Sequence, residues 1–201
     1  MRQAWPQNSA GAGEKVSRMT VQIKIITPGQ WDARPPKSEP ELVNRSVRII
    51  FHHTAGHASD GTVDGAKAYA RAIQASHFAN GWNDSGHNFL VCRNGSILVG
   101  RWFTVTAIQH KKMVRSAHCP GQNDQIGIEH EHYGLEEMTA AQRKASARLQ
   151  AWIADRYGRS KVLPAEPHSK YIATACPANL KDDIGALRSL AQQILDAERD
   201  V

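Results

Sequence analysis

Long apolar runs are missing from this 201-residue chain. No stretch approaches the roughly 18 uninterrupted apolar residues that indicate a transmembrane helix, so we expect no membrane insertion. Cysteine is scarce as well, and three residues, an odd number, do not suggest a disulfide framework. With 41% hydrophobic and 22% charged residues, the chain has the composition and length of one globular domain with a sizeable core. A coiled coil, a collagen-like chain and full disorder are thereby excluded.

Residues 1–18 contain no apolar run, so they lack the core of a secretory signal peptide. They are small and polar, which predicts a disordered N-terminal tail followed by one folded domain at residues 19–201.

Negative charge is outnumbered. Lys and Arg total 25 against 19 Asp and Glu, which gives a net charge of +6. A basic surface favours polyanions such as nucleic acid, anionic lipid or an anionic cell wall. Nucleic acid binding would rest on charge alone, because the sequence has neither an RNA-binding aromatic signature nor a recognisable helix-turn-helix, and we expect no such partner.

β-branched segments alternate with helical ones along the rest of the chain. Strands are predicted at 21–26, 47–51 and 125–131, and a hairpin at 89–99 that turns at Asn94-Gly95. Helices are predicted at 63–78, at 139–157 after a capping box of Thr139 and Gln142, and at 184–195. Since no repeat or linker is visible, we predict a single α/β domain with a mixed central β-sheet flanked by helices.

Two clusters of histidine and cysteine indicate chemistry. His52 and His53 end the apolar strand, while His168 and Cys176 lie in a loop between two predicted helices. Imidazole and thiolate suit Zn²⁺, and three protein ligands leave the fourth tetrahedral position open, as in catalytic zinc sites. Neighbouring strand residues point to opposite faces, so only one of His52 and His53 can face a metal.

These clusters belong to an ordered series of motifs between about Ile26 and Leu180. The series is similar to that of the zinc-dependent N-acetylmuramoyl-L-alanine amidases, a group that contains phage lysozyme-type amidases and peptidoglycan recognition proteins. The matching segments are Trp31-Asp-Ala-Arg-Pro-Pro36, Ile50-Phe-His-His-Thr-Ala55, a middle block from His77 to Gly95, Ser116-Ala-His118, Ile126-Gly-Ile-Glu129, and His168 to Pro177.

The resemblance implies that His52, His168 and Cys176 bind one Zn²⁺ at one edge of the sheet, which leaves His53 a packing or hydrogen-bonding role. It also implies that Glu129 is the catalytic acid/base. A carboxylate there could take a proton from zinc-activated water and deliver it to the leaving amine. A solvated strand carboxylate is the alternative for Glu129, and Glu131 is the second candidate for the acid/base role.

Two positions depart from the family pattern. His87 stands where the family often has tyrosine, and its imidazole could donate a hydrogen bond to an oxyanion or shuttle a proton. Thr174 stands where some members have lysine, as it does in the recognition proteins, and its hydroxyl could donate to the oxyanion without adding charge. Lys170 could replace the missing charge.

Three further residues are expected to contact substrate: His118, Trp82 and Asn88. The alternatives are a satisfied surface histidine for His118 and a half-buried aromatic for Trp82.

The reaction implied by the resemblance is hydrolysis of the amide between the lactyl group of N-acetylmuramic acid and L-alanine. Bacterial peptidoglycan is then the expected partner of a monomeric, lytic enzyme of the endolysin type with antimicrobial action. Such an enzyme would be made in the host cytoplasm without a signal peptide and would reach the cell wall after release. The alternative is a peptidoglycan-binding protein without activity, although all three ligand positions are filled here.

Overall fold

The computed structural model describes residues 20–56 and 59–199, so the tail expected at residues 1–18 lies outside the described residues. Within this part of the chain, no helix combines the length and apolar character needed to cross a membrane. The elements are η1 (Pro28–Trp31), β1 (Leu42–Asn44), β2 (Ile49–His53), α1 (Val63–Ala79), β3 (Phe89–Val91), β4 (Ile97–Val99), α2 (Thr104–Gln109), β5 (Lys112–Val114), β6 (Ile126–His130), α3 (Ala140–Arg156), β7 (Ala165–Pro167), η2 (His168–Lys170) and α4 (Leu180–Ala197).

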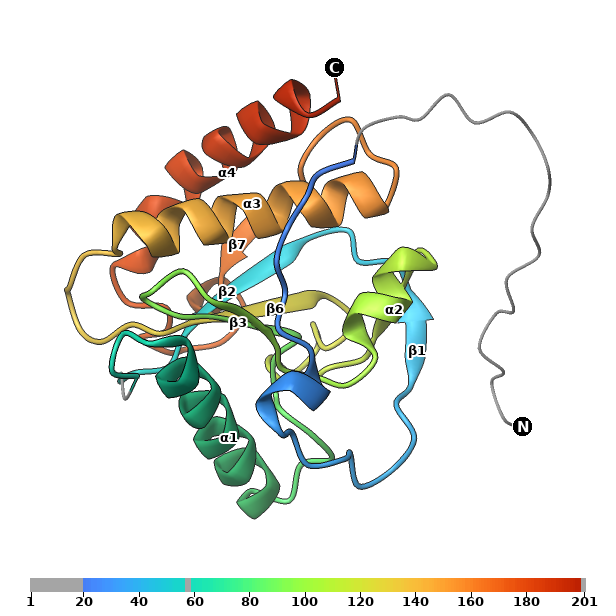
Figure 1. Ribbon diagram of the computed structural model, residues 1–201, viewed down its shortest axis with the longest axis vertical. Coiled ribbons are helices and arrows are strands. Elements are labelled where there is room, and N and C mark those ends of the chain that lie inside the picture. Colours follow the sequence, from blue (N-terminus) through green and yellow to red (C-terminus); the bar gives the residue numbers. More distant parts are fainter. Residues whose placement is uncertain (1–19, 57–58, 200–201) are drawn as a thin grey trace.

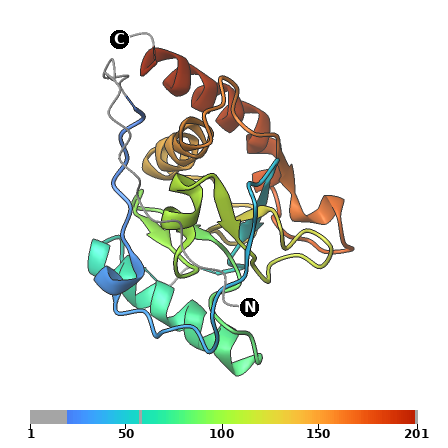
Figure 2. The same cartoon turned by 90° about the vertical axis from the view of Figure 1, so that its right-hand side faces the viewer.

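A five-stranded sheet in the order β4-β3-β6-β2-β7 forms the centre of the domain. Strands β3, β6, β2 and β7 run parallel, and β4 is antiparallel to β3, which confirms the predicted mixed sheet. Helices α3 and α4 lie together on one face of the sheet and α1 lies on the other (Figures 1 and 2). Strands β1 and β5 pair separately as a small antiparallel sheet.

The sheet has a core on each face. Because helices cover both faces, strands of the sheet contain consecutive apolar residues rather than alternating ones, as in Ile49-Ile50-Phe51 of β2 and Phe89-Leu90-Val91 of β3. Phe51, Phe89 and Ile128 are fully buried in the cluster that includes residues of α3 and α4, while Leu90 and Leu98 belong to the cluster on the α1 side. Alternate residues of β2 and β6 therefore face different helices, and this alternation decides which polar side chains meet.

Helix α3 begins as expected but differs in one contact. The Thr139 hydroxyl accepts from the Gln142 N–H at 3.0 Å. The Gln142 side chain does not complete the predicted capping box; it donates to the carbonyls of Val91 and Glu131 at 3.1 and 2.9 Å. The side chain thus ties the start of the helix to the ends of two strands. At the other end, Gly158 has a φ of 69°, as a glycine after a helix C-terminus often does.

The strand predicted at residues 21–26 is wrong. Only Ile26 pairs there, in an isolated bridge to Leu98, although Val21 is fully buried. The apolar pattern of residues 21–26 therefore results from packing against the core and not from strand pairing. The hairpin is confirmed with a longer turn, in which the Gly95 N–H donates to the Cys92 carbonyl and Gly95 has a φ of 85°, a left-handed conformation that suits glycine.

Candidate metal centre

The carboxyl ends of β2 and β7 bring two histidines together. The strands are parallel, and Phe51 lies opposite Pro167, so His52 and His168 follow side by side. Ligand sites in open α/β sheets form at this edge, where parallel strands end. The Ser169 N–H then donates to the Cys176 carbonyl at 2.9 Å, which folds the following loop back toward the strand ends.

His52, His168 and Cys176 form a compact group in which one donor atom from each lies within 4.8 Å of the others. Within the group, Nδ1 of His52 is 3.7 Å from Sγ of Cys176, and the rings of His52 and His168 are 4.3 Å apart between centroids. His53 is outside the group: its N–H donates to the Cys176 sulfur at 3.4 Å, while its ring is 6.2 Å from that of His132. The strand therefore turns one histidine of the pair into the cluster and the other away.

The chemistry of these three groups fits a metal. Neither ring nitrogen of His168 is solvent-accessible or has a hydrogen-bond partner among the described residues. Burial lowers the pKa of both His52 and His168, so both rings are neutral at pH 7 and have a lone pair to share. Burial raises the pKa of the Cys176 thiol to about 12, so a metal would have to displace its proton. Two imidazoles and one thiolate are a donor set that suits Zn²⁺.

His118 lies behind His52 instead of in a substrate groove. It is 5% exposed, and its Nδ1 is 2.8 Å from Nε2 of His52. Its other ring nitrogen, Nε2, is 3.0 Å from the Gln125 carbonyl oxygen. We expected His118 to contact substrate. In the structure it instead contacts His52, a candidate metal ligand, and the sequence did not predict this contact.

Glu129 and His87 lie beside the cluster. Glu129 is opposite His52 in the β2–β6 register, and its Oε2 is 3.0 Å from Nδ1 of His87. The His87 ring is in turn 4.5 Å from that of His52. Burial by itself raises the pKa of Glu129. The charge and hydrogen bond of His87 lower this pKa, with smaller effects from His77 and His130, and the net pKa lies below its ordinary value. Glu129 is thus a buried, ionised carboxylate able to accept a proton.

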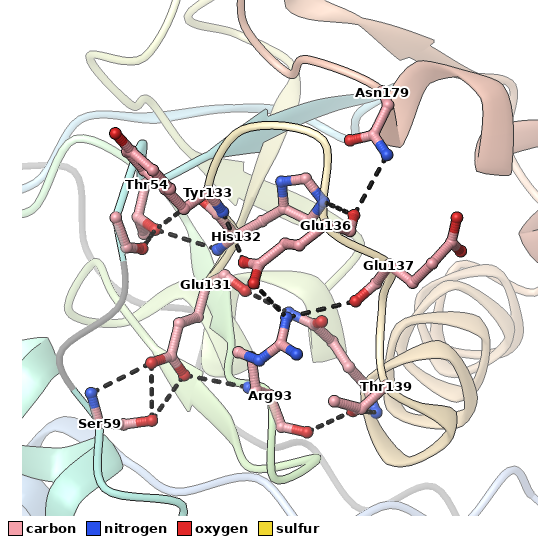
Figure 3. A network of polar contacts seen from close by, with 12 residues as sticks. Thr54, Ser59, Arg93, Glu131, His132, Tyr133, Glu136, Glu137, Thr139 and Asn179 are labelled. Atoms are coloured by element: carbon pink, nitrogen blue, oxygen red, sulfur yellow. Dashed lines mark hydrogen bonds and ion pairs between the residues drawn. The ribbon is translucent and has the colours of Figure 1, made fainter.

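Glu131 has a structural role that conflicts with acid/base catalysis. Its fully buried carboxylate accepts from the Ser59 N–H at 3.1 Å, from the Ser59 hydroxyl and from the Arg93 N–H at 3.0 Å. Figure 3 shows this carboxylate between Ser59 and Arg93. The Arg93 guanidinium continues the network to Glu136, 3.2 Å away. Glu131 therefore joins the loop before α1 to the hairpin, and its oxygens are occupied.

The loop that carries Cys176 is held by Thr174, whose hydroxyl oxygen accepts the Cys176 N–H at 3.2 Å. Thr174 also lines an open cavity of about 450 Å³ with Leu135 and Lys181, so its side chain borders solvent next to the cluster.

Lys170 does not supply charge to the cluster, contrary to the expectation for it. Its Nζ pairs with Glu166 at 2.5 Å. The same carboxylate accepts from the Tyr171 hydroxyl, which accepts from Arg48 at 2.9 Å. This group fixes the turn that follows His168. The four-residue spacing of Glu166 and Lys170 was a signal for the ion pair, whereas the contact with Arg48 joins distant parts of the sequence.

Trp82 and Asn88 differ in accessibility. Trp82 is partly exposed and stacks on His77, with ring centroids 4.6 Å apart. Asn88 is 0% exposed; its amide accepts from the Gly127 N–H at 3.0 Å and donates to the Val114 carbonyl at 3.1 Å. Asn88 therefore joins strands inside the domain, and the expectation that it contacts substrate is wrong.

Known proteins share this sequence pattern and fold. The sequence profile of the family described as N-acetylmuramoyl-L-alanine amidase matches residues 42–179. Peptidoglycan-recognition protein SC2 of Drosophila melanogaster is 29% identical over 161 residues, which cover 77% of this chain and 80% of that protein. The structure of Drosophila PGRP-LB superposes with a TM-score of 0.71 at 26% identity, covering 81% of this chain and 93% of that one. The N-acetylmuramoyl-L-alanine amidase LysC from Clostridium intestinale shares the fold, with a TM-score of 0.63 at 20% identity over 82% of this chain and 97% of that one.

The matched range is more than half of the chain and includes the three residues of the cluster together with Glu129. The chain therefore belongs to the N-acetylmuramoyl-L-alanine amidase family.

Proposed function

We propose that this protein is a zinc-dependent N-acetylmuramoyl-L-alanine amidase, which hydrolyses the amide between the lactyl group of N-acetylmuramic acid and L-alanine. The observation that carries this proposal is the convergence of three donor atoms, from His52, His168 and Cys176, within 4.8 Å of one another. The inaccessible ring nitrogens of His168, which have no partner among the described residues, support a role in binding a metal.

The chain's own residues would divide the work as follows. Zinc, when bound, polarises the scissile carbonyl and makes hydroxide available near pH 7 by lowering the pKa of water to about 7. Glu129 takes the proton from the attacking water and delivers it to the nitrogen of L-alanine as the amide breaks. His87 holds Oε2 of that carboxylate from 3.0 Å away. Thr174 accepts a hydrogen bond from the Cys176 N–H and keeps its own hydroxyl proton to donate to the developing oxyanion.

Peptidoglycan is the proposed partner because related structures hold a fragment of it. A PGRP-LB Y78F mutant, 25% identical to this chain with a TM-score of 0.70, was solved in complex with tracheal cytotoxin. That compound, which is also bound in a structure of PGRP-LE, is a monomeric diaminopimelic acid-type peptidoglycan. We extend the proposal to a lytic role on bacterial cell walls, which the net charge of +6 supports, and to release of the protein from the cytoplasm before it acts.

Recognition without hydrolysis is the second candidate function, because several relatives carry the name of recognition proteins. The two functions differ in their products. Purified peptidoglycan treated with the zinc-loaded protein should release new L-alanine amino termini, and these should disappear when His168 is replaced by alanine. Retention of the protein on intact peptidoglycan, with no new amino termini, would support recognition instead.

A further inference from the structure

We infer that His118 is a positioning residue of the metal centre: it holds His52 in the tautomer whose Nδ1 is free to bind metal. This inference rests on the proposed metal site. It concerns a residue that the sequence suggested for substrate contact and that the fold buries behind the site.

The tautomer follows from a chain of two hydrogen bonds. The backbone carbonyl of Gln125 can only accept a hydrogen bond. Nε2 of His118, 3.0 Å away, therefore carries a hydrogen and donates it to that carbonyl. The partners of the His118 ring are an imidazole and a carbonyl, and neither has a negative charge to stabilise a buried imidazolium. A neutral ring has one N–H, so Nδ1 of His118 is an acceptor.

His52 must complete this chain as a donor. Its Nε2 lies 2.8 Å from Nδ1 of His118 and therefore carries the hydrogen, which leaves a lone pair on its own Nδ1. That Nδ1 is the atom 3.7 Å from Sγ of Cys176. The relay consequently points the lone pair of His52 into the cluster of candidate ligands. Histidine ligands in metal sites commonly owe their tautomer and orientation to such a bond at the other ring nitrogen.

The fold provides a specific seat for the His118 ring. A Cβ atom at Gly127 would lie 2.6 Å from Cδ2 of His118, so the ring packs against the strand at a position that only glycine leaves open. Gly127 is opposite Ile50, two residues before the His52–Glu129 pair, and therefore on the same face of the sheet as His52. The seat and the ligand thus belong to one face of two neighbouring strands.

Gln125, whose backbone carbonyl accepts the hydrogen bond from His118, is held in place by its own side chain. The Oε1 atom of Gln125 accepts from the Ser46 hydroxyl at 3.1 Å and from the Val47 N–H at 3.0 Å. These bonds tie Gln125 to the segment that leads into β2, the strand that carries His52. Gln125 directly precedes β6, the neighbour of β2, so the sheet sets the distance between the Gln125 backbone carbonyl and the His52 ring, which His118 spans.

Zinc affinity tests the inference independently of activity. The dissociation constant would be measured by competition with a chromogenic chelator for the wild type, His118→Leu and His118→Gln. Loss of a partner behind a metal-binding histidine weakens metal affinity by about 10–100-fold, and we expect that loss for His118→Leu. His118→Gln supplies an amide oxygen that accepts and an amide N–H that donates, so it should recover most of the affinity. Unchanged affinity in a folded His118→Leu protein would overturn the inference.

A second test uses the wild-type protein and therefore does not depend on whether the variants fold. In protein labelled with ¹⁵N-histidine, two-bond ¹H–¹⁵N correlations should show hydrogens on Nε2 of both His118 and His52, with zinc shifting Nδ1 of His52. A hydrogen on Nδ1 of His118, or zinc on Nε2 of His52, would overturn the relay. The metal-free tautomers test the relay even if the protein binds no zinc, and zinc binding without hydrolysis would refute the amidase proposal while leaving the relay in place.

Discussion

His52 and Glu129 lie directly opposite each other on the neighbouring parallel strands β2 and β6. The register of two buried strands thus places the candidate ligand and the candidate proton acceptor on the same face of the sheet. A slip of one residue in either strand would turn one of the two side chains to the other face. The relative position of these groups therefore depends on the core of the domain and not on a loop.

Glu129→Gln should separate metal binding from catalysis. The amide keeps the size of the side chain but cannot take a proton, and general acid–base catalysis contributes typically about 10²–10⁴-fold to a rate. We expect kcat to fall by that order while zinc content, measured by elemental analysis, stays equal to that of the wild type. A fall in kcat of less than about threefold would remove Glu129 from the acid/base role.

Cys176→Ala should lose zinc and hydrolysis together, because it removes the one thiol of the cluster. The protein should remain folded, since the sheet has an apolar core on each face. Cys92→Ala is the matched control: Cys92 is a free, buried cysteine of the apolar core on the α1 side, outside the group of candidate ligands, and its loss should leave zinc content unchanged. Full zinc content and full activity in Cys176→Ala would refute the site.

Acid should destabilise the fold in part through His77. Burial, reinforced by His87, lowers the pKa of His77 from 6.5 to about 4, so the folded state favours the neutral ring. The contribution of His77 to the free energy of unfolding is therefore fully present above pH 6.5. It is lost as the pH falls toward 4, by up to about 1.4 kcal/mol per pH unit.

Urea unfolding between pH 4 and 7 would measure this slope in the wild type and in His77→Asn. The asparagine oxygen can still accept from the Gly86 N–H, which now donates to Nδ1 of His77 at 3.0 Å. The variant should show a shallower dependence on pH, because the other buried histidines titrate in both proteins. Equal slopes would show that His77 does not contribute.

Salt should affect cell lysis more than the chemical step. The Debye length falls from about 10 Å at 0.1 M salt to about 3 Å at 1 M, so long-range attraction between a protein of net charge +6 and an anionic wall fades. We expect lysis of whole cells to fall steeply with salt, while cleavage of a small soluble muramyl peptide changes little. A parallel decline for both substrates would show that salt acts at the site itself.

The sequence predicts the position of β2 because a strand buried on both faces contains consecutive apolar residues, here Ile49, Ile50 and Phe51, before the strand ends in two histidines. The same pattern fails for residues 21–26, where Val21 packs into the core but makes no strand pairing. The spacing of apolar residues indicates which residues are buried. Whether they form a strand depends on whether another strand has free backbone N–H and C=O groups beside them.

The hydrogen-bonding roles of buried polar residues are harder to predict from the sequence than the convergence of His52, His168 and Cys176. Asn88 and His118 stand within recognisable motifs, but their roles depend on partners distant in sequence, Val114 for one and His52 for the other. Gly127 was the one local signal for the seat of His118, since a glycine inside a strand can indicate that another group approaches closely.

Cleavage of one amide bond by the zinc-loaded site is the reaction that we propose. A soluble muramyl peptide would be incubated in H₂¹⁸O with the zinc-loaded protein, with the chelated protein and with the same protein reloaded with zinc, and the products would be identified by mass. We expect free stem peptide and N-acetylmuramic acid carrying one ¹⁸O in its lactyl carboxylate, from the loaded and reloaded protein only. Intact substrate in all three reactions, or cleavage at another bond, would refute the proposed amidase activity.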